Sequence, residues 1–231
     1  MIRAVVFDFD GIILETEEAE YLAWRQLWEE TGVDLSLEEW SGGIGTVPGA
    51  GGSFQPYREL VRRSGRSLDQ ETVRARVGTL IAGHLSNRQM QPGVAGWREE
   101  AARLGLSVGI ASSSPRSWVE NHLARLGATG WWPVMACFDD CGKAKPDPAS
   151  YWLACQSLEV APGEALAVED SRNGLLAAKA AGLFCVAVPT AMTAHMDLSE
   201  ADLVLSSLEG TPLAAVLDKL GKAGSPSPTG G

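Results

Sequence analysis

Two pairs of acidic residues follow apolar segments that are far apart in the sequence. The pairs are Asp8 with Asp10, after the apolar run at residues 3–7, and Glu169 with Asp170, after the run at residues 165–168. Neighbouring carboxylates repel one another unless a cation or an unequal protonation state relieves them. Because Mg²⁺ binds a few carboxylates together with water and a substrate phosphate, two such strand ends predict a magnesium site.

Hydroxyl and cationic side chains follow two other apolar runs, in positions that suit a phosphate group. They are Ser112, Ser113, Ser114 and Arg116 after residues 106–111, and Lys145 after residues 134–138. A helix start offers free N–H groups, and an arginine beside it adds charge-assisted hydrogen bonds to an anion. Simple N-capping by Ser112 or Ser114 explains the serines nearly as well when they are considered alone. Lys145 can offset the negative charge of the acids and a phosphate.

Parallel strands are needed to bring these groups together. Five apolar runs, with a sixth at residues 203–205, alternate with helical patterns; the five lie at residues 3–7, 106–111, 134–138, 165–168 and 184–188. Strands that alternate with helices predict an α/β fold with a parallel sheet covered on both faces. Ligands of such sheets bind beyond the carboxyl ends of the strands, which is where the acids, serines and lysine stand.

One long segment interrupts the alternation of strands and helices. Residues 15–88 have apolar positions at helical spacing, so we predict a helical cap there and an α/β core from residues 1–14 and 89–220. The glycine-rich loop at residues 42–52 either cradles a phosphate or joins two helices. Residues 221–231 are rich in Gly, Ser and Pro and are expected to form a disordered tail.

Composition excludes several classes of function. The formal net charge of −10 argues against a nucleic-acid surface, which needs clustered Lys and Arg. No segment approaches the roughly 20 apolar residues that span a bilayer, and the first residues do not form a secretion signal, so we expect a cytoplasmic protein without a membrane partner. A monomer that acts on a small-molecule phosphate ester is the default expectation.

The motifs together resemble those of a known superfamily. In chain order they are Asp8-Phe9-Asp10-Gly11, Ser112, Lys145-Pro146 and Glu169-Asp170. At four successive strand ends they resemble the four motifs of the haloacid dehalogenase (HAD) superfamily, over essentially the whole chain apart from the tail. The segment at residues 15–88 resembles the helical cap of the branch that includes β-phosphoglucomutase and many sugar-phosphate phosphatases. The resemblance implies a Rossmann-like core with a cap domain inserted after the first strand.

The resemblance also implies a role for each motif. Asp8 would attack phosphorus and become an aspartyl phosphate, while Asp10 would protonate the leaving oxygen and then activate water. Mg²⁺ would be held by Asp8, the backbone carbonyl of Asp10 and Asp170, with Glu169 close by. An acid at position 10 argues against dehalogenation, because a halide leaves without a proton. The remaining residues would bind phosphate: Ser112 and Lys145 the transferring group, and Ser113, Ser114 and Arg116 the substrate.

Three functions are compatible with such a fold. The mutases are expected to carry a histidine in the first cap helix and basic residues in the cap, but residues 16–24 lack histidine and residues 42–52 lack Arg and Lys. Arg58 or Arg74 could replace the missing cap base. We therefore predict a Mg²⁺-dependent phosphatase of a small phosphorylated metabolite, a sugar phosphate, with a β-phosphoglucomutase-type mutase as the alternative. A non-catalytic binding protein is the third hypothesis, although no motif acid or lysine is lost.

Overall fold

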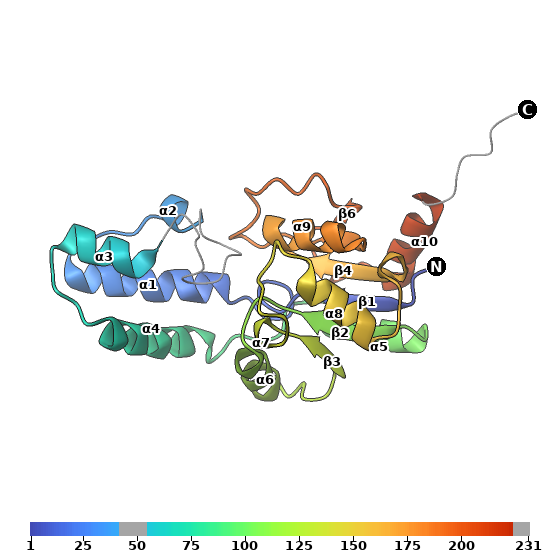
Figure 1. Ribbon diagram of the computed structural model, residues 1–231, viewed down its shortest axis with the longest axis horizontal. Helices are drawn as coiled ribbons and strands as arrows, with labels where there is room; N and C mark the ends of the chain where they lie inside the picture. Colours follow the sequence, from blue (N-terminus) through green and yellow to red (C-terminus); the bar gives the residue numbers. More distant parts are fainter. Residues whose placement is uncertain (42–54, 224–231) are drawn as a thin grey trace, which may run out of the picture.

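The computed structural model describes residues 1–41 and 55–223, so the glycine-rich loop lies outside the described residues. At its centre is a six-stranded parallel sheet in the order β3-β2-β1-β4-β5-β6 (Figure 1). The strands are β1 (Ala4–Phe7), β2 (Ser107–Ala111), β3 (Val134–Ala136), β4 (Ala165–Glu169), β5 (Phe184–Ala187) and β6 (Leu203–Val204). Each of them coincides with one of the apolar runs, and the predicted α/β fold is confirmed.

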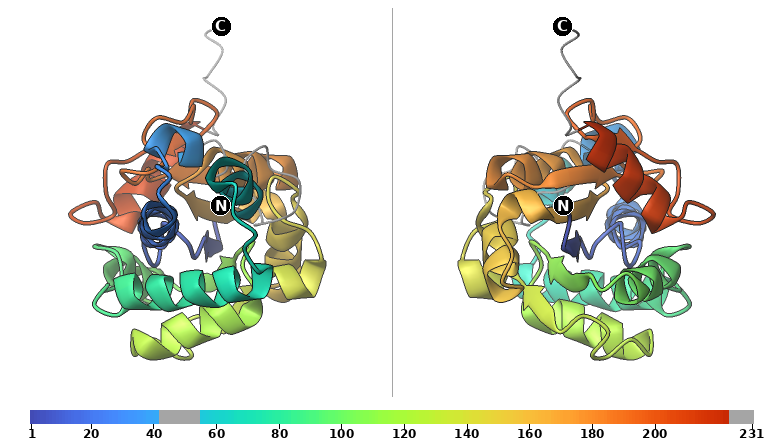
Figure 2. Two further views of the ribbon diagram at one scale, coloured as in Figure 1. Left: turned by 90° about the vertical axis from the view of Figure 1, so that its left-hand side faces the viewer. Right: turned by 90° about the vertical axis from the view of Figure 1, so that its right-hand side faces the viewer.

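Strand β1 lies in the middle of the sheet and is buried on both faces. Because successive side chains of a strand point in opposite directions, Val5 and Phe7 pack into one apolar layer and Ala4 and Val6 into the other. The first layer is formed with α5 (Val94–Arg103), α6 (Arg116–Arg125) and α10 (Leu213–Ala223), and the second with α8 (Ala149–Ser157) and α9 (Arg172–Ala181). Figure 2 shows α5 and α10 on one side of the sheet and α8 and α9 on the other.

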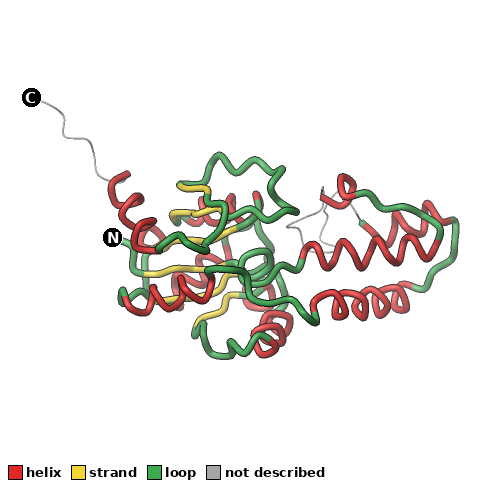
Figure 3. Tube along the Cα trace, turned by 180° about the vertical axis from the view of Figure 1, so that it is seen from behind, coloured by secondary structure: helices red, strands yellow, loops and turns green. Residues whose placement is uncertain are grey.

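Four helices lie together at one end of the molecule, away from the sheet (Figures 1 and 3). They are α1 (Glu17–Thr31), α2 (Leu37–Ser41), α3 (Pro56–Ser64) and α4 (Gln70–Leu85). Ala23 and Leu27 of α1 lie one turn apart and pack against Leu60 of α3 and Val73 and Val77 of α4. This apolar cluster is separate from the two layers on the sheet. The division of the chain into an α/β core and a helical cap stays a prediction.

The end of the chain differs in part from expectation. Helix α10 continues to Ala223, so the first residues of the predicted tail are helical, and residues 224–231 lie outside the described part. A short helix, α7 (Phe138–Cys141), starts at the last residue of the apolar run that predicts β3. Among the described residues, no helix is both long and apolar enough to cross a bilayer.

Candidate active site

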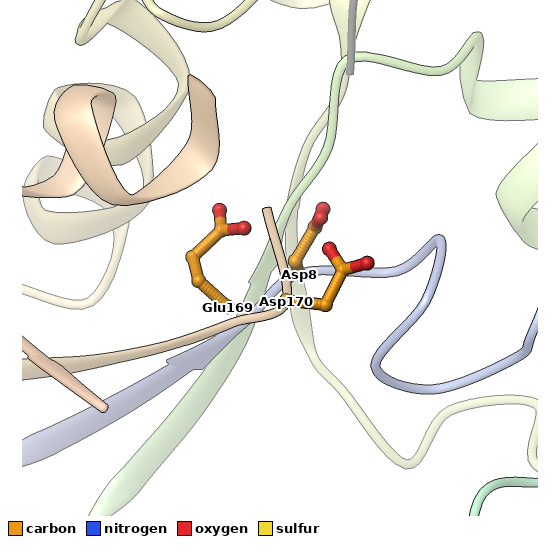
Figure 4. Close-up of side chains that lie close together, drawn as sticks. All are labelled: Asp8, Glu169 and Asp170. Atoms are coloured by element: carbon orange, nitrogen blue, oxygen red, sulfur yellow. The ribbon is translucent and has the colours of Figure 1, made fainter. Parts of the chain in front are cut away.

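Three buried carboxylates meet at the carboxyl ends of the two central strands. Strands β1 and β4 pair with Phe7 opposite Val168, so the residues that follow this pair, Asp8 after β1 and Glu169 and Asp170 at the end of β4, are neighbours in space. One carboxylate oxygen from each of the three acids lies within 4.8 Å of the others. Figure 4 shows the three side chains rising from the two strand ends toward the same space. The structure thus brings three of the predicted metal ligands together.

Lys145 provides the positive charge of this cluster. Its Nζ lies 2.7 Å from Asp8 Oδ1 and 2.6 Å from Glu169 Oε1, in a position where the lysine side chain is almost wholly buried. Burial lowers the pKa of Lys145, but the two carboxylates outweigh burial and the net shift is upward. The backbone N–H of Lys145 donates to Ser113 Oγ at 3.0 Å. Ser113 therefore holds the segment that carries the lysine.

The cluster has more negative than positive charge, which fits a bound cation. Burial raises the pKa of Asp8 and Asp170, and the charge of Glu169 raises both further. Glu169 Oε2 is buried without a hydrogen-bond partner among the residues that the structure describes. Carboxylate oxygens are the ligands that Mg²⁺ prefers, so this set of buried carboxylates fits a magnesium ion. The identity of the metal is a proposal.

Two glycines leave room for the acids. A Cβ at Gly174 would lie 1.8 Å from Glu169 Oε2, and a Cβ at Gly11 would lie 2.3 Å from Asp170 Oδ2. Gly11 also has a φ of +85°, in the left-handed region that side chains other than glycine rarely adopt. The carboxylates of the cluster therefore depend on the absence of side chains at both positions.

The carboxylate of Asp10 is not part of the cluster and is held by three donors of its own. Oδ1 accepts hydrogen bonds from Thr16 Oγ1 at 2.7 Å and from Trp118 Nε1 at 3.0 Å. Oδ2 accepts one from Ser114 Oγ at 2.6 Å. These donors come from the loop before α1, from α6 and from the loop after β2. The carboxylate is thereby fixed by three different segments of the chain.

Two of the predicted phosphate-binding residues have hydrogen-bond partners within the protein. Ser112 is completely buried, and its Oγ accepts a hydrogen bond from the backbone N–H of Ser114 at 2.9 Å. The Arg116 guanidinium donates to Asp140 Oδ2 at 2.7 Å and to the carbonyl of Met135 at 2.8 Å. The structure does not bring Arg116 to the carboxylate cluster, because Asp140 and the carbonyl of Met135 bind its guanidinium.

Three residues of the site were not singled out from the sequence. Tyr151 is fully buried on α8, and its hydroxyl donates to Glu169 Oε1. Trp118 and Thr16 are the donors to Asp10 described above. Thr16 is the last residue of the segment that begins at Asp8, and a threonine at this spacing from the two acids is a signal in the sequence. Trp118 and Tyr151 are visible in the sequence only as aromatic residues near a motif. Trp118 lies in the first turn of α6, which starts at Arg116, and Tyr151 lies in the first turn of α8, which follows Lys145.

Comparison with known proteins places this site in a family. The family model described as haloacid dehalogenase-like hydrolase matches residues 5–188, which include all four motifs. The chain belongs to this family. The resemblance predicted from the motifs is confirmed, and so is the prediction that the chain is an enzyme of this hydrolase family.

Relatives of the HAD-family chain match it over nearly its whole length. "Putative phosphatase YhcW" of Bacillus subtilis is 39% identical, over 95% of this chain and 98% of the relative. Validoxylamine A 7'-phosphate phosphatase of Streptomyces hygroscopicus subsp. limoneus is 32% identical, over 90% and 95%. The crystal structure of CbbY from Rhodobacter sphaeroides in complex with phosphate superposes with a TM-score of 0.73 at 30% identity, over 91% and 96%. The names of the first two relatives support the predicted class of phosphoric monoester hydrolase.

Proposed function

We propose that this HAD-family chain is a Mg²⁺-dependent phosphatase that hydrolyses a small phosphorylated metabolite, a sugar phosphate, through an aspartyl phosphate. The observation that carries the proposal is the separation of two acids into different environments. Asp8 lies beside Lys145 in the carboxylate cluster, whereas Asp10 is held apart by three hydrogen-bond donors. A nucleophile beside a cation and a separately fixed acid are the two groups that two-step phosphoryl transfer requires.

The chemistry follows from these two positions. An oxygen of Asp8 attacks phosphorus, the ester P–O bond breaks, and Asp10 gives its proton to the leaving oxygen. Asp10 then takes a proton from a water molecule, whose oxygen attacks phosphorus and releases Asp8 and inorganic phosphate. Lys145, together with the loop from Ser112 to Ser114, neutralises and orients the phosphoryl group.

Asp8 and Asp170 would hold the metal together with the backbone carbonyl of Asp10. Glu169 lies close by, where it is hydrogen-bonded to Lys145 and Tyr151. When bound, Mg²⁺ would offset the charge of the phosphate and the acids. The substrate class is supported by the names of the relatives, one of which is a phosphatase of validoxylamine A 7'-phosphate, and by the phosphate complex of CbbY.

The test compares the wild-type protein with Asp8→Asn on a panel of sugar phosphates that includes β-glucose 1-phosphate, with and without Mg²⁺. Free phosphate and glucose 6-phosphate are both measured. We expect Mg²⁺-dependent release of phosphate by the wild type and none by Asp8→Asn, which should remain folded. Formation of glucose 6-phosphate without free phosphate would establish the mutase instead. Equal turnover by both proteins would exclude Asp8 as the nucleophile, and turnover by neither would favour a binding protein.

A further inference from the structure

A cavity of about 500 Å³ lies among the helices α1, α3 and α4. Its volume is within the range of small-molecule binding sites, which is roughly 300–1,000 Å³. Its wall combines one carboxylate, two guanidinium groups and two aromatic rings with apolar side chains of α4. The charged and aromatic residues of this wall are Glu20, Trp24, Tyr57, Arg58 and Arg74.

One residue of the cavity wall, Glu20, is linked to the catalytic acid through Thr16. Glu20 lies one turn along α1 from Thr16, to whose carbonyl its N–H donates at 2.9 Å, and the Thr16 hydroxyl is bonded to Asp10. Burial and the charge of Asp10 raise the pKa of Glu20 to about 7, as expected for two acids in the same region. No donor or cation of the described residues contacts the half-buried carboxylate of Glu20. A group of the substrate close to its phosphate can therefore donate to this carboxylate.

The cavity extends well beyond Glu20. On α4 it is lined by residues from Gln70 to Ile81, which at 1.5 Å per residue span about 16 Å of helix. Helix α1 packs along α4, so the wall formed by Glu20 and Trp24 runs beside the same stretch (Figure 1). This length exceeds that of one six-membered ring with its phosphate. A substrate that fills the cavity must continue past its first ring.

The far part of the cavity has the groups that bind a hydroxylated ring. Trp24 and Tyr57 offer flat apolar surfaces to the C–H face of a ring, and each carries a polar atom at its edge. Arg58 and Arg74 form no ion pair with the described residues. By contrast, the other arginines on the same two helices are paired with acids: Arg62, Arg63 and Arg76. The two unpaired guanidinium groups are free to donate hydrogen bonds to hydroxyl oxygens.

We propose that this cavity binds the second ring of a two-ring phosphorylated carbohydrate, whose first ring carries the phosphate and lies beside Glu20. Trp24 and Tyr57 contact the faces of the second ring, and Arg58 and Arg74 bind its hydroxyl groups. This inference rests on the proposed phosphatase function, because the reaction positions the phosphorylated ring at Asp8. It defines the substrate more narrowly than a sugar phosphate.

Two glycines of α4 provide a matched pair of variants. Gly78 lines the cavity, whereas Gly83 lies on the same helix outside it, and an added Cβ meets no atom within 4 Å at either position. Gly78→Phe is therefore expected to fill part of the cavity, and Gly83→Phe to leave it open. Both changes replace glycine in a helix interior by a residue with better helix propensity, so both proteins are expected to fold.

The experiment measures kcat/KM for trehalose 6-phosphate and glucose 6-phosphate with Mg²⁺ in the wild type and both variants. We expect the wild type to prefer the two-ring ester at least tenfold. Gly78→Phe should lower that preference at least tenfold, mainly through KM, and Gly83→Phe should preserve it. Thermal unfolding and circular dichroism verify that each variant is folded.

The outcomes separate this inference from the proposed function. If the wild type hydrolyses glucose 6-phosphate as efficiently as trehalose 6-phosphate, the cavity does not bind a second ring, while the phosphatase proposal stands. The same holds if glucose 1,6-bisphosphate, assayed in the same way, is preferred to both and Gly78→Phe lowers that preference, since the arginines would then serve a second phosphate. If the wild type releases phosphate from no ester, the proposed function fails and the cavity proposal fails with it.

Discussion

The indole N–H of Trp118 donates a hydrogen bond to Asp10 Oδ1 at 3.0 Å, so the orientation of this carboxylate depends on a residue of α6. The indole ring also lies edge-on to the imidazole of His122, one turn further along α6, with 4.3 Å between the ring centroids. This contact fixes the orientation of the indole. Thr16 and Ser114 bind the same carboxylate but belong to loops. Trp118 is therefore the donor to Asp10 that a rigid helix positions.

Trp118→Phe keeps an aromatic ring beside His122 but removes the donor. A hydrogen bond to a charged group contributes about 1.5–3 kcal/mol, and each 1.4 kcal/mol of barrier corresponds to a factor of ten. We expect kcat to fall about tenfold with little change in KM, because the substrate phosphate is bound by other residues. Trp152→Phe is the control, since Trp152 is 52% exposed on α8. A rise in KM with unchanged kcat would show that Trp118 does not orient Asp10.

Gly174→Ala tests whether the Glu169 carboxylate needs the space left by the missing side chain of Gly174 on α9. The added methyl carbon would lie 1.8 Å from Glu169 Oε2, so the carboxylate must shift away from Lys145 or the helix must move. We expect a loss of about 1–3 kcal/mol in the free energy of unfolding and a marked loss of phosphate release.

Gly96→Ala is the matched control for this change. Gly96 is the third residue of α5, as Gly174 is of α9, and an added Cβ there meets no atom within 4 Å. Alanine at position 96 should stabilise the helix by about 1 kcal/mol and leave activity unchanged. Urea denaturation and a phosphate-release assay on both variants measure the two effects. Equal behaviour of the two variants would contradict the packing described for Glu169.

The sheet and the groups at its edge could be predicted because parallel strands have a strong sequence signal. Buried strands are short apolar runs, and their carboxyl ends meet at one edge, so the sequence alone predicts that Asp8, Lys145 and Asp170 lie together. Strand β3 is shorter than the apolar run that predicts it, residues 134–138. It ends at Ala136 because Cys137 already caps the short helix α7.

The hydrogen bonds around the acids could not be predicted in the same way. Trp118 and Tyr151 reach Asp10 and Glu169 from helices packed on opposite faces of the sheet, and their directions depend on how each helix sits on the strands. The place of Arg116 at a helix start suits an anion and therefore predicts a phosphate ligand. The nearby acid Asp140 and the carbonyl of Met135 bind it instead, and a motif alone does not reveal such competitors.

Tyr151→Phe tests the support that the phenol hydroxyl gives to Glu169, the acid beside the proposed metal ligands Asp8 and Asp170. Without its donation, Glu169 Oε1 is bound by Lys145 alone, and the carboxylate is less firmly oriented. Partners that orient metal-site carboxylates typically contribute about 10–100-fold to metal affinity. We expect the Mg²⁺ concentration for half-maximal phosphate release to rise at least tenfold, while kcat at saturating Mg²⁺ changes little. Tyr21→Phe, on α1, is the control. Unchanged Mg²⁺ dependence would show that the hydroxyl serves stability alone.

Glu20 should make stability depend on pH in a defined direction. Burial and the charge of Asp10 raise its pKa from 4.5 to about 7, so between these values the folded protein retains a proton that the unfolded chain has released. The free energy of unfolding therefore falls as pH rises through this interval. Glu20→Gln carries no titrating group, so its stability relative to the wild type should increase between about pH 4 and about pH 8, by on the order of 1 kcal/mol for a half-buried group.

Urea denaturation of the wild type and Glu20→Gln at both ends of the interval measures this difference. Glu71→Gln, an exposed change in the first turn of α4, controls for the loss of one negative charge. A difference between wild type and Glu20→Gln that stays constant across the interval would place Glu20 in a water-like environment, away from Asp10. If the stability of Glu20→Gln relative to the wild type increases with pH, and that of Glu71→Gln does not, Glu20 has the raised pKa expected of a carboxyl group that lacks a donor. A hydroxyl group of the substrate could then donate to it.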